Sequence, residues 1–485
     1  MIKKIFICLS FIFLCNVTSA QKALDIQNAK ERDQRMAWWR EARFGMFIHF
    51  GIYAQFGGEY KGHFQKAKNG EWLFNRMKVP VAEYKAMAQK FNPKNYDAEK
   101  WVKTAKEAGM KYIVVTAKHH DGFALFDTKV SDWSITKASP YGKDMLKPLA
   151  EACRKYGVKL CFYYSQAQDW GNAGGATALR PMRQGWPNPD STRIDAYAKA
   201  NSGSWDPIQT AKPYAEYFRK VALPQVKELL TNYGDIAVIW WDTPMYRETP
   251  ETREMYELVK NLAPNIIQND RLGVPGVSGD FKTPEQKIPN WEELDGQDWE
   301  TCMTMNDTWG YRKDDKNWKS AQDLVRKLID ITSKGGNFLL NVGPQPDGTF
   351  PPESVERLAT VGNWMKKYGA AVYGSHANPI EAQKWGRITA KDEKKATTLY
   401  LSVFDWPADG ALKLAGIPHK ALSATLVGGK SKLKLTQSDD GSLEITGLPL
   451  AAPDDIASVI EVKLKGFAKK KSFGLQRKMN SGSID

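Results

Sequence analysis

A repeating order of amphipathic helix, glycine and short apolar run limits the fold of this chain more than any other feature. A glycine follows within two residues each of four expected helices, residues 98–108, 145–156, 213–233 and 320–333. Such a glycine lets the chain leave a helix and reverse into a strand. The apolar runs that alternate with helices are residues 45–50, 112–117, 159–165, 236–242, 266–270, 299–303 and 338–342. Seven runs of this kind predict an α/β fold, an irregular TIM-like (β/α)8 barrel rather than an open sheet.

The pattern changes after residue 377, where short alternating runs are separated by turns that contain glycine. The runs are residues 397–404, 412–414, 424–427, 432–436, 443–445 and 459–464. They predict a C-terminal antiparallel β-sandwich packed on the barrel. With 485 residues, 42% of them hydrophobic, the chain is long enough and apolar enough for two such cores. We expect a signal peptide over residues 1–20, the catalytic barrel over 21–376, the sandwich over 377–466 and a basic, disordered tail over 467–485.

The first twenty residues have the order of a secretory signal. Lys3 and Lys4 precede an apolar stretch over residues 5–17, and small residues follow up to Ala20. The stretch is shorter than the roughly 20 residues needed to span a bilayer, so a membrane anchor is the weaker alternative. We expect export to the periplasm or the extracellular space, with Gln21 as the first residue of the mature protein.

The chain is basic, with 69 lysines and arginines against 55 aspartates and glutamates and a formal charge of +14. Loss of Lys3 and Lys4 with a signal peptide would leave +12, and part of the excess lies in the lysine-rich C-terminal end. A solvated tail is the plain explanation, and contact with an anionic polysaccharide or an envelope surface is the alternative. No basic helix or repeated aromatic and basic pattern indicates a nucleic-acid partner.

Polar residues end several of the expected strands, where the active site of a barrel lies. Asp242 follows a run of apolar and aromatic residues and suits a nucleophile or a base, with a helix N-cap as the alternative. His119 and His120 suit hydrogen bonds to sugar hydroxyls or support of Asp242, and two structural histidines are the alternative. Glu300 follows Trp299, and desolvation beside an indole would raise its pKa as a general acid requires. A surface role for Glu300 is equally compatible, and Glu292 and Glu293 compete with it.

The aromatic residues, 12% of the chain, indicate a site that stacks on sugar rings. Tryptophans near the expected strand ends are Trp72, Trp170, Trp240, Trp241, Trp299 and Trp309. No nucleotide-binding loop, esterase elbow or zinc-protease motif is present. Cys153, Cys161 and Cys302 lack metal-site spacing, and adjacent histidines on a strand point to opposite faces, so we expect no metal and no cofactor.

Five ordered motifs together resemble family 29 of the glycoside hydrolases, the α-L-fucosidases. They are residues 39–51 (WREARFGMFIHFG), 117–122 (AKHHDG), 240–242 (WWD), 299–302 (WETC) and 335–344 (GGNFLLNVGP). The resemblance runs from about residue 38 to residue 373. It implies a retaining exo-hydrolase built on a (β/α)8 barrel and a β-sandwich, which works without a cofactor.

The resemblance also implies roles for single residues. Asp242 matches the family's nucleophile, and Glu300 matches the acid/base of many members. The positions that contact fucose would be His49, Glu71, Trp72, His119, His120, Trp240, Arg271 and either Tyr163 or Tyr164. The expected partner is a fucosylated oligosaccharide or polysaccharide, and an oligomer is compatible with the sequence. A secreted fucoside-binding protein without turnover, or an exo-glycosidase acting on a related sugar such as D-galactose, are the alternatives.

Overall fold

The computed structural model describes residues 29–176, 206–242, 249–273, 279–289, 291–294, 296–377, 380, 383–417, 419–429 and 432–466. The expected signal peptide, the expected tail and residues 177–205 lie outside these ranges. Among the described residues, no helix combines the length and the apolar composition needed to cross a membrane.

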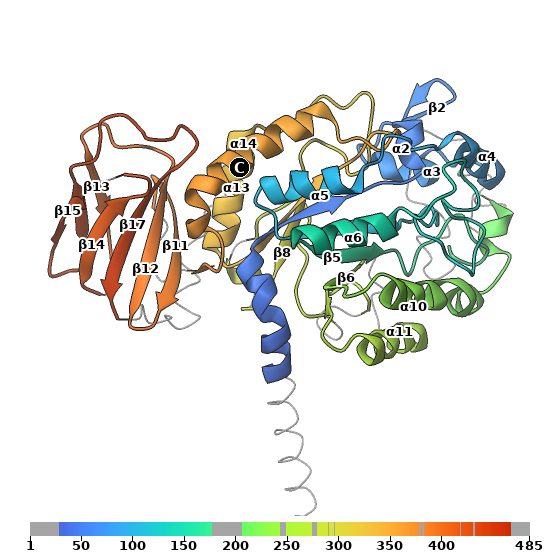
Figure 1. The fold of residues 1–485 in the computed structure, drawn as a ribbon, viewed down its shortest axis with the longest axis horizontal. Helices are drawn as coiled ribbons and strands as arrows, with labels where there is room; N and C mark the ends of the chain where they lie inside the picture. The colour runs from blue at the N-terminus through green and yellow to red at the C-terminus, as the bar shows by residue number, and fades with distance from the viewer. Residues whose placement is uncertain are drawn as a thin grey trace, which may run out of the picture.

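A curled sheet of seven parallel strands forms the centre of the larger part of the molecule (Figure 1). Its strands are β1 Phe44–Ile48, β4 Tyr112–Lys118, β5 Lys159–Tyr164, β6 Val238–Trp241, β7 Ile267–Gln268, β8 Glu300–Thr304 and β9 Asn337–Val342. They are hydrogen-bonded in the order β7-β6-β5-β4-β1-β9-β8. All seven predicted strands are therefore present, within a few residues of their expected limits.

A short irregular segment joins the two edges of this sheet and completes the barrel. Phe281 forms a parallel bridge with Asn269 at the end of β7, and Lys282 forms one with Trp299 before β8. Around the barrel the chain thus passes through eight positions in sequence order, which confirms the predicted (β/α)8 type. The sequence did not predict this eighth position, because residues 281–285 contain a single large apolar residue and a proline.

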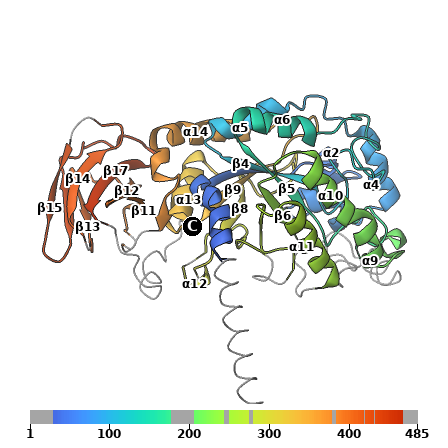
Figure 2. The same cartoon turned by 60° about the horizontal axis from the view of Figure 1, so that its bottom comes forward.

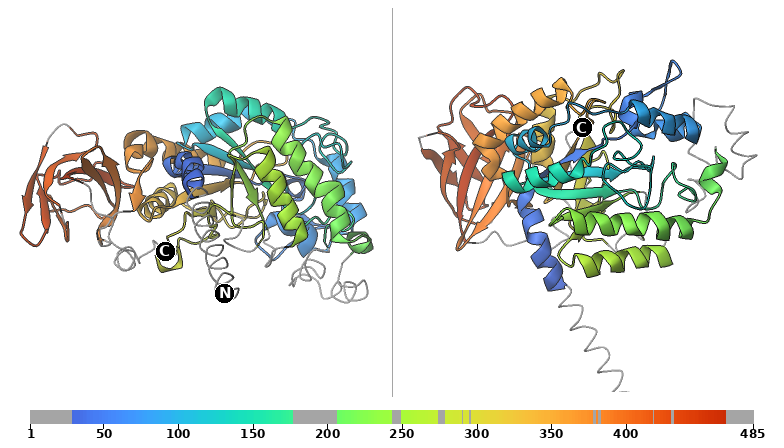
Figure 3. Two further views of the ribbon diagram at one scale, coloured as in Figure 1. Left: turned by 90° about the horizontal axis from the view of Figure 1, so that it is seen from below. Right: turned by 45° about the vertical axis from the view of Figure 1, so that its right-hand side comes forward.

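Helices surround the barrel, and several that follow each other along the chain lie side by side in pairs (Figure 3). The longer ones are a helix over residues 29–42 and α4 Val81–Met87, α5 Ala98–Glu107, α6 Leu146–Tyr156, α10 Leu223–Asn232, α11 Pro250–Leu262, α13 Ala321–Ser333 and α14 Pro352–Tyr368. Short helices are α2 Tyr53–Phe56, α3 Leu73–Arg76, α9 Tyr214–Tyr217 and α12 Trp291–Leu294. Gly157 and Gly234, which follow α6 and α10, have φ angles of 67° and 80°. This left-handed backbone is the tight reversal that the glycine pattern predicts.

An antiparallel sheet of eight strands lies to one side of the barrel (Figure 2). Its strands are β10 His376–Ala377, β11 Gly386–Glu393, β12 Ala396–Val403, β13 Ala411–Leu414, β14 Ala421–Leu426, β15 Lys432–Gln437, β16 Leu443–Thr446 and β17 Ser458–Lys465. The sheet folds over an apolar core of its own, which gives the sandwich-like architecture expected from the sequence. A small hairpin, β2 Glu59–Tyr60 and β3 His63–Phe64, stands apart from both sheets.

The antiparallel sheet is joined to the barrel through α13 and α14. Asp330 on α13 is fully buried and accepts hydrogen bonds from Lys334 at 3.1 Å and from Arg387 of β11 at 2.5 Å. Trp364 of α14 donates from its indole nitrogen to the carbonyl oxygen of Ala457 at 2.9 Å. A buried ionic cluster with these partners fixes one orientation of the two parts, since each charged group would be costly to bury alone.

Candidate active site

A cavity of about 220 Å³ opens at the carboxyl ends of the barrel strands. Its walls come from nearly every strand end and the loops that follow, as the barrel architecture requires. The lining residues are Phe47, His49, Asn69, Glu71, Trp72, His119, His120, Tyr163, Trp240, Asp242, Arg271, Glu285, Cys302 and Trp309. Nine of the eleven residues predicted from the sequence to bind sugar or to act in catalysis, Asp242 among them, are brought together here.

A larger cavity, about 820 Å³, lies at the opposite end of the barrel beside the helix over residues 29–42. Its walls include Trp38, Lys159 and Asp235, which lie at the amino ends of the strands or before them. Active sites of such barrels lie at the carboxyl ends, so the smaller cavity is the candidate site.

Asp242 follows β6, and several side chains of the smaller cavity contact its carboxylate. Tyr163 donates to its Oδ2 at 2.8 Å, and Arg271 donates to its Oδ1 at 2.9 Å. Nε2 of His120 lies 3.2 Å from Oδ2. Burial alone would raise the pKa of Asp242, but the hydrogen bonds from His120 and Tyr163 and the charge of Arg271 hold it well below its ordinary range. The carboxylate is therefore ionised and oriented at any pH near neutral.

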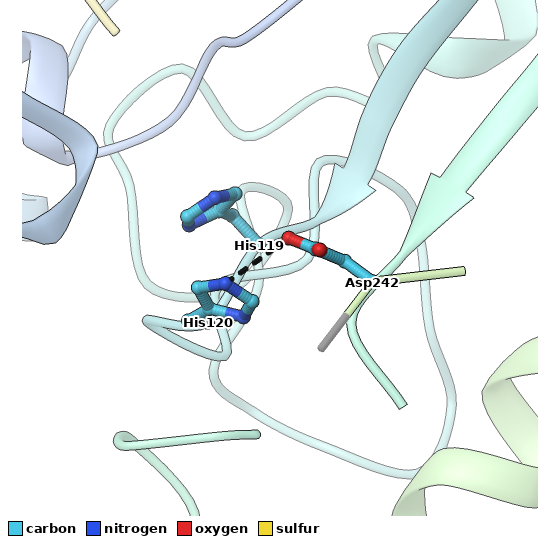
Figure 4. Close-up of side chains that lie close together, drawn as sticks. All are labelled: His119, His120 and Asp242. Atoms are coloured by element: carbon cyan, nitrogen blue, oxygen red, sulfur yellow. Dashed lines mark ion pairs between the residues drawn. The ribbon is translucent and has the colours of Figure 1, made fainter. Parts of the chain in front are cut away.

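The loop after β5 decides how His120 faces Asp242. Ser165 donates its hydroxyl hydrogen to the carbonyl oxygen of Gln168 at 2.7 Å, so its oxygen accepts from Nδ1 of His120 at 2.6 Å. Nε2 of His120 is thereby directed at Asp242, as Figure 4 shows. Each ring nitrogen of His120 thus faces one partner, Ser165 at Nδ1 and Asp242 at Nε2.

His119, His120 and Asp242 have potential ligand atoms within 4.8 Å of one another, which makes them the candidate metal group of the described residues. The two histidines do not point to opposite faces as expected for a strand, because β4 ends at Lys118, and both rings line the cavity with centroids 4.2 Å apart. Arg271 already binds the carboxylate, so a divalent cation would meet a fixed positive charge. The geometry favours a pair of hydrogen-bonding groups over a metal site.

His49 offers a hydrogen-bond acceptor to the cavity. Asn341 uses its amide nitrogen on the carbonyl oxygen of Trp309 at 2.8 Å, so its oxygen accepts from Nδ1 of His49 at 2.7 Å. Burial lowers the pKa of His49 to about 4, although the bond to Asn341 opposes the shift. A neutral ring with a proton on Nδ1 leaves Nε2 as an acceptor, which suits a sugar hydroxyl.

Glu71 and Trp72 belong to one 3₁₀ turn, Gly70–Trp72, at the rim of the barrel. Glu71 accepts a hydrogen bond from the backbone nitrogen of Gly310 at 2.9 Å through Oε2. Its Oε1 is buried without a partner among the described residues, and burial raises the pKa of the carboxyl group to about 7. A buried oxygen of this kind requires a donor, and a hydroxyl group of a ligand in the cavity would supply one.

The two adjacent tyrosines of β5 point in opposite directions, and the structure resolves the alternative that the sequence left open. Tyr163 faces the cavity, whereas Tyr164 lies on the outer face and donates to Gln225 of α10 at 2.8 Å. Alternation along a strand causes this difference. Tyr164 is therefore not a residue of the site, and its inclusion was wrong.

Glu300 lies beneath the cavity and does not line it. Its Cα is paired with Asn337 at the first position of both β8 and β9, at the amino end of the barrel. Its side chain is 1% exposed and accepts hydrogen bonds from Tyr112 at 2.5 Å and from the indole nitrogen of Trp240 at 3.1 Å. Glu300 is therefore absent from the lining of the cavity, where the sequence placed the acid/base.

The carboxyl group at the mouth of the cavity is that of Glu285, which the sequence analysis did not identify. Glu285 lies on the segment that closes the barrel, and its side chain is 44% exposed. Nη2 of Arg271 donates to Glu285 at 3.1 Å while Nη1 donates to Asp242. One guanidinium group therefore links the two carboxyl groups of the site. Of the competing glutamates, Glu293 is exposed and pairs with Lys287, and the side chain of Glu292 lies outside the described part.

The remaining lining residues missed as sugar contacts are Phe47, Asn69 and Cys302, and Trp309 was expected only as a stacking aromatic. The strand pattern could have indicated Phe47 and Cys302. Side chains two residues apart on a strand face the same side, and each of these residues lies two positions from one that was expected in the site. Asn69 and Glu285 carry no such signal, since neither belongs to an apolar run.

A closed barrel with an ionised carboxylate in its cavity, a second carboxyl group at the mouth and aromatic walls defines a glycoside hydrolase. The model of the α-L-fucosidase family matches residues 12–370, and the chain belongs to that family, family 29 of the glycoside hydrolases. The resemblance found in the sequence is thereby confirmed.

Named relatives agree with this assignment. Human plasma α-L-fucosidase is 28% identical over 446 residues, which cover 85% of this chain and 85% of the relative. α-L-Fucosidase isoenzyme 1 of Paenibacillus thiaminolyticus has 33% identity and a TM-score of 0.76, with 90% of this chain and all of that chain covered. A family 29 enzyme of Bacteroides thetaiotaomicron, solved as a trapped covalent intermediate with 2-fluoro-fucosyl fluoride, has 28% identity and a TM-score of 0.75 over 90% of this chain and 97% of that chain.

Proposed function

We propose that the protein is a retaining exo-α-L-fucosidase in which Asp242 is the nucleophile and Glu285 is the general acid and base. The observation that carries this proposal is the pair of carboxyl groups linked by Arg271 at the cavity. Retaining glycosidases place their two carboxyl groups about 5 to 5.5 Å apart. The width of one guanidinium group with a hydrogen bond on each side is compatible with that spacing.

The reaction then needs only groups of this chain and water. Asp242 attacks the anomeric carbon while Glu285 gives a proton to the departing glycosidic oxygen, which leaves a covalent fucosyl-enzyme. Glu285, now ionised, takes a proton from a water molecule that attacks the same carbon, and fucose leaves with its configuration retained. The covalent intermediate of the Bacteroides relative supports this two-step route.

The exposure of the two candidate glutamates supports the choice of Glu285. A general acid must reach the leaving group, and the second step needs water at the same place. Glu285 is half-exposed at the mouth of the cavity, whereas Glu300 is 1% exposed beneath its wall. The exo mode is supported by the size of the cavity, since about 220 Å³ is a small, single-residue space.

The hydroxyl groups of the sugar would form hydrogen bonds with polar atoms of the cavity that can still accept or donate one. Nε2 of His49 is an acceptor, and the buried Oε1 of Glu71 and Nδ1 of His119 have no partner in the described part of the chain. Trp72 and Trp240 would contact the apolar faces of the ring. The substrate class that follows is a glycan with a terminal α-L-fucosyl residue.

The test uses 4-nitrophenyl and 2-chloro-4-nitrophenyl α-L-fucosides. Asp242→Gly should lose turnover and, with azide, should release β-fucosyl azide, because azide replaces the missing nucleophile on the opposite face. Glu285→Ala should lose more activity on the poorer leaving group and, with azide, should form α-fucosyl azide from the covalent intermediate. NMR of the azide products distinguishes the two roles. Equal loss on both substrates in Glu285→Ala, without an azide product, would remove Glu285 from the acid/base role.

Export is part of the proposal and rests on the sequence of residues 1–20. N-terminal sequencing of the protein from the producing cell should give Gln21 as the first residue. The division into a catalytic part up to residue 376 and a sandwich over residues 377–466 is likewise proposed. Limited proteolysis should cut near that boundary if the two parts are separable units.

A further inference from the structure

Glu300 is a buried acidic group that the proposed reaction does not use. Both of its carboxyl oxygens are occupied, one by Tyr112 of β4 and one by Trp240 of β6. The side chain thus extends from β8 across the interior of the barrel to strands that are not its neighbours in the sheet. A carboxyl group buried in this way costs free energy relative to an apolar residue of similar size. Stability of the fold therefore does not explain why a glutamate lies here.

The partner that connects Glu300 with the site is Trp240. This indole lies between the buried interior and the cavity, because it bonds to Glu300 at one edge and lines the cavity with its ring. The ring of Tyr163 is stacked on it with centroids 5.7 Å apart and planes inclined by 19°. The guanidinium of Arg271 lies 4.7 Å from the centroid of the same ring.

Tyr163 and Arg271 are also two of the groups that hold Asp242. The orientation of one indole therefore supports two donors to the proposed nucleophile. A tryptophan ring can rotate about its side-chain bonds, and stacking on its faces does not fix its edge. The hydrogen bond from its ring nitrogen to Glu300 fixes that edge.

We propose that Glu300 is a positioning residue that acts through Trp240. Its hydrogen bond orients the indole, and the indole in turn positions Tyr163 and Arg271, the two side chains that donate to Asp242. The inference rests on the proposed function, since it concerns the same site. It assigns the conspicuous glutamate of the Trp299–Glu300 motif to alignment of the site, and leaves proton transfer to Glu285.

The variants compared are Glu300→Gln, Glu300→Leu, Trp240→Phe and the double variant Trp240→Phe/Glu300→Leu. Glutamine keeps an acceptor for the indole and a polar contact with Tyr112, so it should retain kcat/KM within a few-fold. Leucine leaves the indole nitrogen unpaired, and kcat/KM should fall on the order of 10- to 100-fold. The loss should be equal for 4-nitrophenyl and 2-chloro-4-nitrophenyl fucosides and should not be rescued by azide.

The double variant tests the route through Trp240. Once phenylalanine has removed the ring nitrogen, Glu300→Leu should cause little further loss, since interacting residues are not additive. An equal cost of Glu300→Leu in both backgrounds would overturn the route. Damage of similar size in Glu300→Gln and Glu300→Leu, larger for the poorer leaving group and rescued by azide, would make Glu300 a proton donor and overturn the proposal.

Affinity for a fucose-configured iminocyclitol, measured by calorimetry, provides a readout that needs no turnover. Glu300→Leu should weaken this binding and Glu300→Gln should largely preserve it. If the wild type hydrolyses no fucoside but binds the iminocyclitol with this pattern, the proposed function fails while the positioning role stands. If the wild type does not bind it at all, both fail.

Discussion

Replacing Glu300 with glutamine should remove a large pH dependence from the stability of the protein. Burial raises the pKa of Glu300 from its ordinary value of 4.5 to about 7, although the hydrogen bonds from Tyr112 and Trp240 oppose part of the shift. In the unfolded chain the same carboxyl group returns to its ordinary value. Between these two pH values the folded protein keeps a proton that the unfolded chain has released.

The sign and the size follow from this difference. The contribution of Glu300 to stability is fully present below about pH 4.5 and is lost as the pH rises through about 7, because burial in the folded protein disfavours the ionised carboxyl group. At about 1.4 kcal/mol for each pKa unit, the loss is about 3 kcal/mol. Glutamine does not titrate, so the free energy of unfolding of the wild type minus that of Glu300→Gln should fall by about 3 kcal/mol as the pH rises from 4 to 8.

Guanidinium unfolding followed by tryptophan fluorescence at several pH values measures this difference. Glu71 and Asp121 also have pKa values raised to about 7 by burial, but both are present in the two proteins and their effects cancel. Glu257→Gln is the matched control, since Glu257 is exposed on α11 and stays in water on folding. Parallel pH curves for wild type and Glu300→Gln would refute the reasoning, because they would mean that Glu300 is ionised in the folded protein.

Three further predictions concern other groups. Tyr163→Phe removes a donor to Asp242 and should lower kcat/KM about 10- to 100-fold, whereas Tyr164→Phe should cost about 1 kcal/mol of stability and leave kcat/KM unchanged; steady-state kinetics and guanidinium unfolding check the pair. As the pH decreases from 6.5 to about 4, the free energy of unfolding of the wild type minus that of His49→Gln should fall by about 3 kcal/mol, because a histidine in the unfolded chain takes up a proton that buried His49 does not, while all other titrating groups are common to both proteins. Arg387→Met breaks the buried cluster around Asp330 and should cost about 3 kcal/mol in the same unfolding assay with kcat/KM unchanged, and a changed kcat/KM at unchanged stability would contradict a purely structural role.

Much of the site could be predicted because a barrel brings the residues that end its strands together at one face. Asp242 and His49 end apolar runs, and parallel strands bring the residues that end such runs to one face. The same rule, applied strictly, would have argued against Glu300, since it begins its strand instead of ending it. The motif that contains Glu300 resembles the family's pattern, but a motif does not state how deep in the barrel its side chain lies.

The sequence by itself determined the elements and their class, because glycines after helices and apolar runs of strand length are local signals that the backbone must obey. Only the tertiary structure decided which glutamate lines the cavity. Glu285 reaches the mouth because the segment after Phe281 fills the gap between β7 and β8, and nothing in its composition announces a strand. Glu300 is buried because its pairing with Asn337 places it at the amino end of the barrel. The depth of a side chain in the barrel and the closure of the sheet depend on the register between strands far apart in the chain. That register is set by tertiary packing and not by local sequence.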